Sequence, residues 1–396
     1  MNVTATASLL RNINRSVVLE LVRKHSPISR SEIGRQLDMS LPTVMRIVED
    51  LMEEDLVRFS DDAGQSTGGR PPSLVEFKGE AYAVVGVDLG GTKMFGTVAD
   101  LSGNIQHELY VPHEKENGPE DYVEGLCEMI EELLDAPRPP EQEIRGVGIG
   151  APGVTLVPEG VVTWAPSLKW RDLPLQDILN ERFAVPVFVE NDVNLAALGE
   201  FGFGAGRGVQ SLVSIAVGTG IGAGIIVGGA LYRGHNQAAG EICYMLPGTE
   251  YLGRRYDRFG ALESLASATG VVERARQLMM QEGEQIPQGL SAKDVFDAAR
   301  RDDPLARKVV DDTIDYLSLA VVNVSAALDP EVIILGGGVS RSADLLIEPI
   351  LQRIDGSIPF VPKIVASPLG RRAAVMGAIM FVLNLTTERF AIRKLP

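Results

Sequence analysis

The sequence predicts an α/β protein with a body of two similar lobes and a small helical unit in front of it. Residues 1–78 contain three helical patterns and two short strand-like runs. Further along, the chain is rich in glycine, and apolar strand-like runs alternate with helical stretches. Residues 84–92 (VVGVDLGGT) and 214–222 (SIAVGTGIG) repeat one pattern, a strand, a turn of Gly and Thr, and a second strand. This repeat predicts two lobes that each offer a phosphate-binding hairpin to a shared cleft.

The composition is that of an ordinary globular protein. Its 396 residues suffice for two or three domains, with 45% hydrophobic and 23% charged residues. Two cysteines, Cys127 and Cys243, exclude a disulfide framework and indicate a reducing compartment. Because no secretion signal is recognisable, we expect a cytoplasmic location.

One uncharged stretch, residues 211–232, is long enough to span a bilayer. Its six glycines and one threonine divide it into two short strand-like runs. We therefore expect a buried hairpin with a functional turn, and no membrane partner.

Two helices open the chain. The first is predicted after Asn14 from positions that recur at helical spacing: Val18, Leu21, Val22 and His25. The second begins at Ser29, which would form a capping box with Glu32, and its buried face holds Ile33 and Leu37.

A third helix begins near Ser40, with Pro42 in its first turn. Its apolar stripe consists of Val44, Ile47, Val48 and Leu51. Two strand-like runs follow at residues 56–59 and 74–77, separated by a polar loop at 61–72. Three helices and a hairpin in this order predict a winged helix-turn-helix.

This unit is the first candidate site, because a recognition helix reads base edges with polar side chains in its first turns. Ser40, Thr43 and Arg46 lie opposite the apolar stripe, and Arg70 in the wing is placed to enter a minor groove. Basic residues of the first two helices, Arg30 among them, would contact the DNA backbone. The alternative is a winged helix that binds another protein, which the acidic second half of the third helix favours.

The net charge of −16 argues against sequence-independent binding of nucleic acid over the whole surface. The charge is unevenly distributed. Residues 11–35 hold six basic and two acidic residues, whereas residues 38–62 hold two basic and eight acidic residues. Positive charge is therefore local to one short segment.

Glycine-rich turns after apolar strands form the second candidate site. Such turns let backbone N–H groups approach a phosphate, and a preceding Asp can hold Mg²⁺ through water. The candidate residues are Asp88, Gly90, Gly91, Thr92 and Lys93 in the first turn, Gly218, Thr219 and Gly220 in the second, and Gly336, Gly337 and Gly338 in the third. One such turn alone is as often a plain hairpin, but three at strand ends favour nucleotide binding.

The third candidate is VENDVN, which follows the predicted strand 185–189. A carboxylate at a strand end can accept a proton from a substrate hydroxyl while Asn191 holds a neighbouring hydroxyl. The alternative is structural, because Asp192 could simply cap the helix that runs through Leu198.

Together these motifs closely resemble the ROK family of repressors, open reading frames and sugar kinases, in particular its regulator branch. Residues 14–57 resemble the DNA-binding signature of that branch. The body motifs follow in the family's order: VGVDLGGTK, GIGAPG, VENDVNLAALGE, VGTGIGAGIIVGGALYRG, AAGEI and LDPEVIILGGGVS.

The resemblance implies a two-lobed actin-like or hexokinase-like ATPase fold behind the winged helix. It implies a DNA-binding domain at 1–78, a smaller lobe at 79–200 that the C-terminal helix near 372–386 joins, and a larger lobe at 201–371. It implies that the glycine turns bind ATP and that Asp192 acts as the general base in catalysis. The implied sugar-binding residues are Ser167, Asn191, Asp192, Glu241, Tyr244 and Glu263.

The chain also departs from the family pattern. Cys243 and Tyr244 stand where Gly-His is usual, and the following loop lacks the three usual cysteines. A single Cys cannot hold tetrahedral Zn²⁺, so we expect no structural zinc and no other metal ligand set. Tyr244 replaces a His that usually touches the sugar, and Ser167 stands where Asn is commoner, so both bear on the choice of sugar.

The resemblance implies a sugar-responsive transcriptional regulator, most often a repressor, that binds operator DNA as a homodimer or a dimer of dimers. DNA binding would require no cofactor. The alternative is a Mg-ATP-dependent sugar kinase acting on a hexose or an N-acetylated amino sugar, and one chain could combine both roles. A third possibility is a nucleotide-binding scaffold that uses its winged helix for protein contacts.

Overall fold

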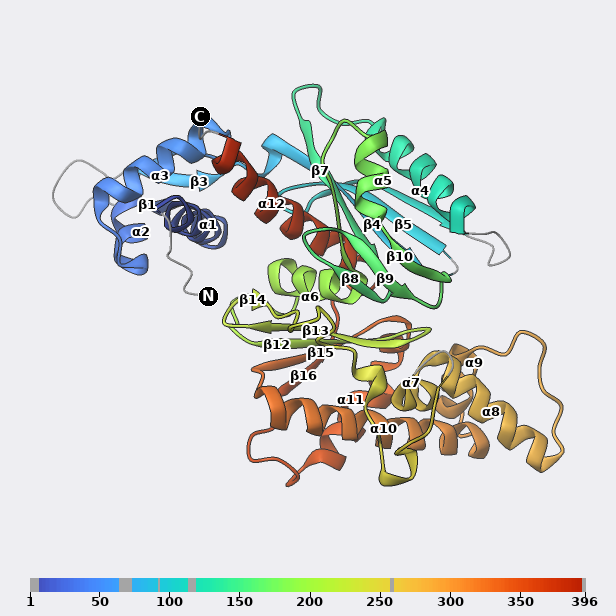
Figure 1. The fold of residues 1–396 in the computed structure, drawn as a ribbon. Helices are drawn as coiled ribbons and strands as arrows, with labels where there is room; N and C mark the ends of the chain where they lie inside the picture. The colour runs from blue at the N-terminus through green and yellow to red at the C-terminus, as the bar shows by residue number, and fades with distance from the viewer. Residues whose placement is uncertain (1–6, 64–72, 92, 113–118, 257–259, 394–396) are drawn as a thin grey trace.

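A computed structural model describes residues 7–63, 73–91, 93–112, 119–256 and 260–393. The N-terminal unit lies at one end of the molecule, and two five-stranded sheets form the body (Figure 1). None of the helices in the described part of the chain is long and apolar enough to cross a membrane.

The N-terminal unit is a winged helix-turn-helix, as predicted. Its helices are α1 (Ala7–His25), α2 (Arg30–Leu37) and α3 (Leu41–Glu53). Its strands β2 (Val57–Ala63) and β3 (Ser73–Phe77) form the wing. A short strand that the sequence did not predict, β1 (Ile28–Ser29), pairs with β3 and completes a sheet of order β1-β3-β2.

Three local expectations for this unit were wrong. The first helix begins at Ala7, not after Asn14. The Ser29 hydroxyl accepts the Glu32 N–H at 3.1 Å, but the Glu32 carboxylate binds Arg35 at 2.6 Å instead of closing a capping box. His25 does not belong to the apolar face of α1. That face is made by Val18, Leu19 and Val22, and His25 is exposed at the end of the helix.

The first body sheet has the order β11-β7-β4-β5-β6. Its strands are β4 (Tyr82–Gly90), β5 (Lys93–Asp100), β6 (Ile105–Pro112), β7 (Glu143–Ala151) and β11 (Val187–Asn191). Strands β4, β7 and β11 run parallel, so their carboxyl ends meet at one edge. The small sheet β10-β9-β8 lies beside it, built from β8 (Val154–Leu156), β9 (Val161–Ala165) and β10 (Trp170–Leu173).

The second body sheet has the order β14-β13-β12-β15-β16. Its strands are β12 (Leu212–Val217), β13 (Ile221–Val227), β14 (Ala230–Leu231), β15 (Val332–Gly336) and β16 (Lys363–Ala366). The uncharged stretch 211–232 forms the β12–β13 hairpin and β14, which confirms the expected hairpin.

Helices α6 (Asp192–Phe203) and α12 (Ala373–Arg393) pack against each other between the sheets (Figure 1). Helix α12 covers β4 and β7, and α6 lies on β12 and β13. The helices cross closely at two glycines. A Cβ at Gly199 would lie 2.0 Å from the Ala373 oxygen, and one at Gly377 would lie 1.7 Å from the Leu195 oxygen.

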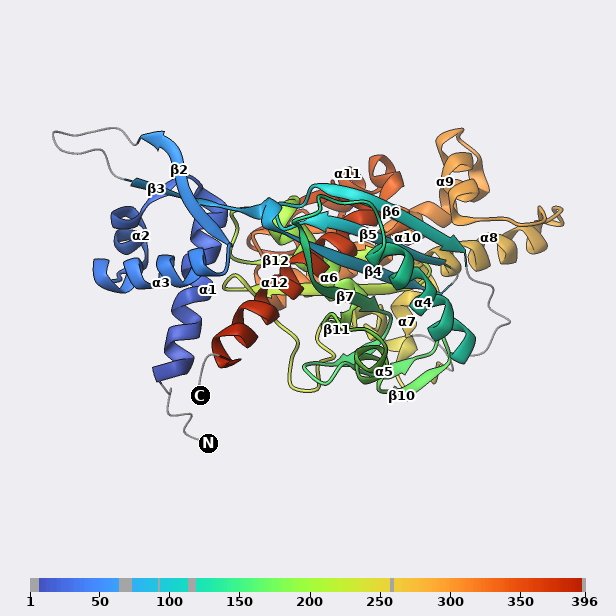
Figure 2. The ribbon, with the colours of Figure 1, turned by 90° about the horizontal axis from the view of Figure 1, so that it is seen from above.

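The remaining helices are α4 (Pro119–Leu134), α5 (Leu175–Arg182), α7 (Ala261–Ala266), α8 (Ala268–Glu282), α9 (Ala292–Arg300), α10 (Pro304–Leu328) and α11 (Ala343–Ile354). Helices α4 and α5 lie on the outer side of the first sheet, and α10 and α11 on that of the second, while α7, α8 and α9 pack beside α10 (Figures 1 and 2).

Candidate functional site

The candidate site begins at the carboxyl edge of the first sheet. Asp88 near the end of β4 pairs with Gly150 of β7, which pairs with Glu190 of β11. A Cβ on Gly150 would lie 3.1 Å from the Cα of Asp192, so Asp192 sits directly over this glycine. Parallel strand ends therefore bring Asp88 and Asp192 together, although they are far apart in the chain.

Two of the glycine turns meet at the carboxyl edge of the second sheet. The register pairs Ala216 at the end of β12 with Gly336 of β15. Gly337 has φ 77°, and a Cβ there would lie 2.4 Å from the Val217 oxygen. Nothing lies within 4 Å of a Cβ placed on Gly218 or Gly338. Both backbones are therefore open to a ligand, which fits a phosphate or nucleoside.

Four carboxylates from different elements gather beside these edges. Burial raises the pKa of Asp88 to about 6. Burial and the neighbouring Asp88 and Glu241 raise the pKa of Asp192 well above its usual value. Burial also raises the pKa of Glu241, and it raises that of Glu263 to about 7 with a smaller contribution from Glu241. Buried like charges favour the protonated acids, and a ligand hydroxyl or a cation would relieve the repulsion.

Asp192 does not cap its helix, contrary to the structural alternative. The N-cap of α6 is Asn191, whose amide oxygen accepts the Asn194 N–H at 2.9 Å. The Asn191 Nδ2 donates to the Gly153 oxygen at 2.8 Å. Asp192 is the first helical residue, and its Oδ1 accepts the Val193 N–H at 2.9 Å. These bonds hold the Asp192 carboxylate at the carboxyl edge of the first sheet.

Glu263 joins the carboxylate cluster to the second glycine turn. Its Oε2 accepts the Ile221 N–H at 2.7 Å, directly after Gly220. Its Oε1 is buried and has no hydrogen-bond partner among the described residues. An unpaired buried carboxylate oxygen is costly unless a ligand supplies a donor, so this atom is suited to accept a hydroxyl.

Glu263→Gln is expected to make stability less dependent on pH. The folded pKa lies above the usual 4.5, so the native state binds more protons than the unfolded chain from about pH 4.5 to 7, and stability falls as pH rises through that window. We expect the variant to be more stable than the wild type by about 1 to 2 kcal/mol at about pH 8. The difference should shrink towards about pH 4.5.

Thermal melting across pH measures this difference. Glu273→Gln on the exposed face of α8 is the matched control and should show no such change. A Glu263→Gln variant that loses stability equally at every pH contradicts the prediction.

An ion pair that the sequence reading missed lies behind the cluster. Glu190 is fully buried, and its Oε2 accepts Nε of Arg233 at 2.7 Å. Its Oε1 accepts the Asn191 N–H at 2.8 Å and Nδ2 of Asn194 at 3.0 Å. Arg233 follows β14, so the pair ties the second sheet to the strand that carries Asn191. In the sequence, the Glu of VENDVN and the single Arg of LYRG were the signals that could have indicated this ion pair.

A second contact supports the same segment. The Gln237 side chain donates from Nε2 to the Val157 oxygen and accepts the Val157 N–H at its Oε1, both at 2.7 Å. The segment between Arg233 and Glu241 thus contacts the first lobe at two points, Glu190 of β11 and the backbone of Val157. This segment leads to Glu241, which is near enough to Asp192 to raise its pKa.

The remaining site predictions have mixed outcomes. Ser167 is exposed, and its Cβ lies 3.5 Å from a Cβ placed on Gly91. Tyr244 is 54% exposed. Partial burial raises its pKa, and the neighbouring Cys243, Glu241 and Glu263 raise it further, so its ring borders the cluster. Lys93 lies over the Tyr110 ring, 5.9 Å from the centroid. The predicted Thr92 lies outside the described residues.

The DNA-binding candidates also differ in their contacts. Arg46 is exposed and has no ion pair within the described part of the winged helix. The Arg30 guanidinium stacks over Phe59 of the wing, 5.3 Å from the ring centroid. The Ser40 and Thr43 hydroxyls lie 2.8 Å apart and hydrogen-bond each other. Arg70 lies outside the described residues.

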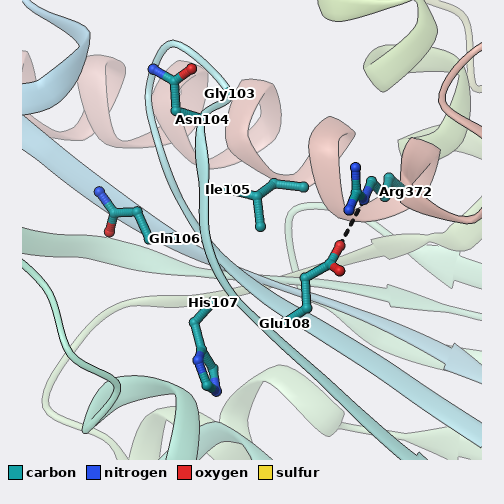
Figure 3. Close-up of a pocket in the computed structure, with 7 residues that line it drawn as sticks. All are labelled: Gly103, Asn104, Ile105, Gln106, His107, Glu108 and Arg372. Carbon is teal, nitrogen blue, oxygen red and sulfur yellow. Dashed lines mark hydrogen bonds and ion pairs between the residues drawn. The ribbon is translucent and has the colours of Figure 1, made fainter.

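A polar groove of about 580 Å³ lies elsewhere, along the edge strand β6. Glu108 accepts Nε of Arg372 at 2.7 Å at its mouth (Figure 3). Its other lining residues are Gly103, Asn104, Ile105, Gln106 and His107. None of the predicted site residues lines it, so it is separate from the carboxylate cluster.

Comparison with known proteins identifies the family. The ROK family model matches residues 84–384, and a winged helix-turn-helix DNA-binding model matches residues 11–58. The chain belongs to the ROK family. Both regions of this ROK protein therefore match the expectations from its motifs.

Two ROK relatives bear different names. The chain is 30% identical over 388 residues to a putative xylose repressor of Caldicellulosiruptor sp. strain Rt8B.4, covering 95% of this chain and 97% of the relative. It is 36% identical over 305 residues to a glucokinase of Halalkalibacterium halodurans, covering 74% of this chain and 92% of the relative. The repressor match covers nearly the whole of this chain, and the glucokinase match about three quarters of it.

A solved structure shares the whole architecture. A ROK family transcriptional regulator, a homologue of the E. coli MLC protein, superposes with a TM-score of 0.83 over 97% of this chain and 98% of its own. The two chains are 24% identical, so this likeness shows the fold alone. Among the described residues, no three or more His, Cys, Asp or Glu side chains are placed so that together they could hold one metal ion. The expected absence of zinc stays a prediction.

Proposed function

We propose that this protein is a sugar-responsive transcriptional repressor that acts on operator DNA in the cytoplasm. The winged helix would bind the operator as a homodimer or a dimer of dimers, because twofold operators match twofold proteins. A sugar would bind between Asp192, Glu241 and Glu263 and change how the DNA-binding units are held. The full-length match to a xylose repressor supports this proposal.

The observation that carries the proposal is the course of helix α6. Its first residue is Asp192, and its last turn contacts α1 of the winged helix. Nη1 of Arg23 donates to the Gly202 oxygen at 3.5 Å, and its guanidinium lies 5.4 Å from the Phe203 ring centroid. Nζ of Lys24 lies 4.8 Å from the Phe201 centroid. One rigid helix thus joins the proposed sugar site to the DNA-binding unit.

This geometry explains how a sugar would weaken DNA binding. A ligand shifts an equilibrium only if it binds one arrangement more tightly, and a coupling of about 1–3 kcal/mol gives a graded response. A sugar that draws Asp192 towards Glu241 would displace α6, and α1 would follow its last turn. The spacing of two winged helices in a dimer would then no longer match the operator.

Operator release by sugars tests the proposal. Full-length protein would select duplexes from a random DNA pool, and the tightest duplex would be titrated with pentoses, hexoses and N-acetylated amino sugars. The names of the relatives place xylose and glucose first in the panel. Release by one sugar supports the proposal, and specific DNA binding that no sugar weakens contradicts it.

Loss of the α1–α6 contact is expected to uncouple the two sites. In the double variant Arg23→Gln and Lys24→Gln, the sugar affinity should stay unchanged because neither residue reaches the cluster. The factor by which sugar weakens operator binding should fall by about fivefold or more. The quantity compared is the ratio of operator affinity without sugar to that with sugar. Any direct effect of the lost charges on DNA affinity cancels in this ratio.

Arg300→Gln is the matched control. Arg300 pairs with Asp344 on the surface of the body, so its loss should leave the ratio unchanged. An unchanged ratio in the double variant contradicts the role of α6.

A second candidate function is an ATP-dependent sugar kinase, which the open backbones at Gly218 and Gly338 favour. Bound Mg-ATP would supply the phosphoryl group and neutralise its charge. Asp192 would accept the proton of the sugar hydroxyl, and its raised pKa suits a general base. Sugar-dependent release of ADP that disappears in Asp192→Asn supports this activity. No turnover with any sugar contradicts it and leaves the cleft as a sensor.

A further inference from the structure

Two apolar side chains face solvent at the start of the recognition helix. Leu41 is 48% exposed and Met45 is 37% exposed. They are four residues apart, so they lie on the same face of α3. The buried stripe of this helix, Val44, Ile47, Val48 and Leu51, does not include them. The core of the unit therefore does not require apolar residues at these two positions.

The hydroxyls that the sequence favoured as base readers are engaged elsewhere. The Ser40 Oγ accepts the Thr43 N–H at 3.4 Å as the N-cap of α3. The two hydroxyls also hydrogen-bond each other at 2.8 Å. Their first role is therefore to begin the helix.

Charge limits which part of α3 can enter a groove of DNA. The acidic side chains Glu49, Asp50 and Glu53 all lie in its second half, where phosphates would repel them. The first turns carry no acid, and exposed Arg46 directly follows Met45. The exposed side chains at the start of α3 are Ser40, Leu41, Pro42, Met45 and Arg46. The three long ones, Leu41, Met45 and Arg46, have the reach to contact base edges.

We propose that Leu41 and Met45 read the C5-methyl groups of thymines in the major groove. Thymine alone offers a methyl group there, and apolar side chains are the groups that recognise it. Arg46, next to Met45, has the donors that pair with a guanine edge. Each half-site would then hold thymines beside a guanine. This readout rests on the proposed DNA-binding function.

Replacing thymine by deoxyuridine tests the readout, because it removes the methyl group and keeps the base pair. Full-length protein would be titrated with its tightest selected duplex, in which thymines are replaced one at a time. Loss of one buried methyl should weaken wild-type binding about fourfold at each contacted position. In Leu41→Ala or Met45→Ala, the effect of deoxyuridine should vanish at the position that side chain contacts.

The controls separate this readout from other roles. Leu319→Ala, an equally exposed leucine on α10 in the body, should keep the full deoxyuridine effect. The slope of affinity against salt should not change in Leu41→Ala, because no phosphate contact is lost. Folding of each variant is checked by thermal melting.

Three results would overturn the readout. The first is that deoxyuridine does not weaken wild-type binding at any position. The second is that its effect persists in both alanine variants. A change of oligomeric state in Leu41→Ala, measured by sedimentation, would make this face a contact between two copies of the chain. Failure to select any duplex is distinguishable, because it overturns the proposed repressor function together with the readout.

Discussion

Glu54→Gln is expected to lower the free energy of unfolding by about 3–5 kcal/mol, because it leaves two buried arginines without their shared counter-charge. Glu54 lies at the end of α3 and forms an ion pair with Arg15 of α1. Nη2 of Arg145, on β7 of the body, lies 4.0 Å from the same carboxylate. The side chains are only 6%, 11% and 2% exposed for Arg15, Glu54 and Arg145.

Further contacts make this cluster the junction between the winged helix and the body. The Tyr82 hydroxyl donates to the backbone carbonyl oxygen of Glu54 at 3.0 Å, and the Arg145 guanidinium lies 4.8 Å from the Tyr82 ring centroid. Nε of Arg145 donates to the Thr386 hydroxyl of α12 at 2.7 Å. Helix α1 lies beside α12 in both views (Figures 1 and 2). Loss of Glu54 should therefore loosen the DNA-binding unit from the body as well.

Chemical denaturation measures the loss, and proteolysis should show earlier cleavage near residue 80. Glu49→Gln is the control, since Glu49 is exposed on the same helix and its loss should cost little. A Glu54→Gln variant as stable as this control would show that the cluster does not hold the two parts together.

Asp192→Asn is expected to weaken sugar binding about 10- to 100-fold. A bound sugar hydroxyl would favour the charged carboxylate, and hydrogen bonds to a charged acceptor contribute about 1.5–3 kcal/mol. Asn keeps the shape and can still accept the Val193 N–H. Burial and Asp88 already disfavour the charged form, so the neutral Asn should not destabilise the fold. Operator affinity without sugar should stay as in the wild type, and sugar should no longer release the DNA.

Calorimetric titration with the releasing sugar measures this effect. Asp177→Asn is the matched control, because Asp177 lies in the first turn of α5 and is exposed away from the cluster. Equal sugar affinity in Asp192→Asn and wild type would remove Asp192 from the site. Better binding by the wild type at higher pH would further show that the charged carboxylate is the acceptor.

Local sequence signals predicted the elements because their causes are local. The spacing of Val44, Ile47, Val48 and Leu51 predicted the buried face of α3, and all four are buried. The glycine turns predicted both hairpins, β4–β5 and β12–β13. The capping box at Glu32 failed because a competing partner, Arg35, lies one turn further along the same helix.

By itself, the sequence determined the winged helix, the two hairpins and the candidate carboxylates, since periodicity, turns and motif order depend on neighbouring residues. Only the tertiary structure decided which of these residues meet. It placed Asp192 over Gly150, paired buried Glu190 with Arg233, and set Glu54 between Arg15 and Arg145. It also showed that one helix has Asp192 at one end and the DNA-binding unit at the other. Such contacts join residues far apart in the chain, and they follow from how sheets and helices pack, which no local pattern contains.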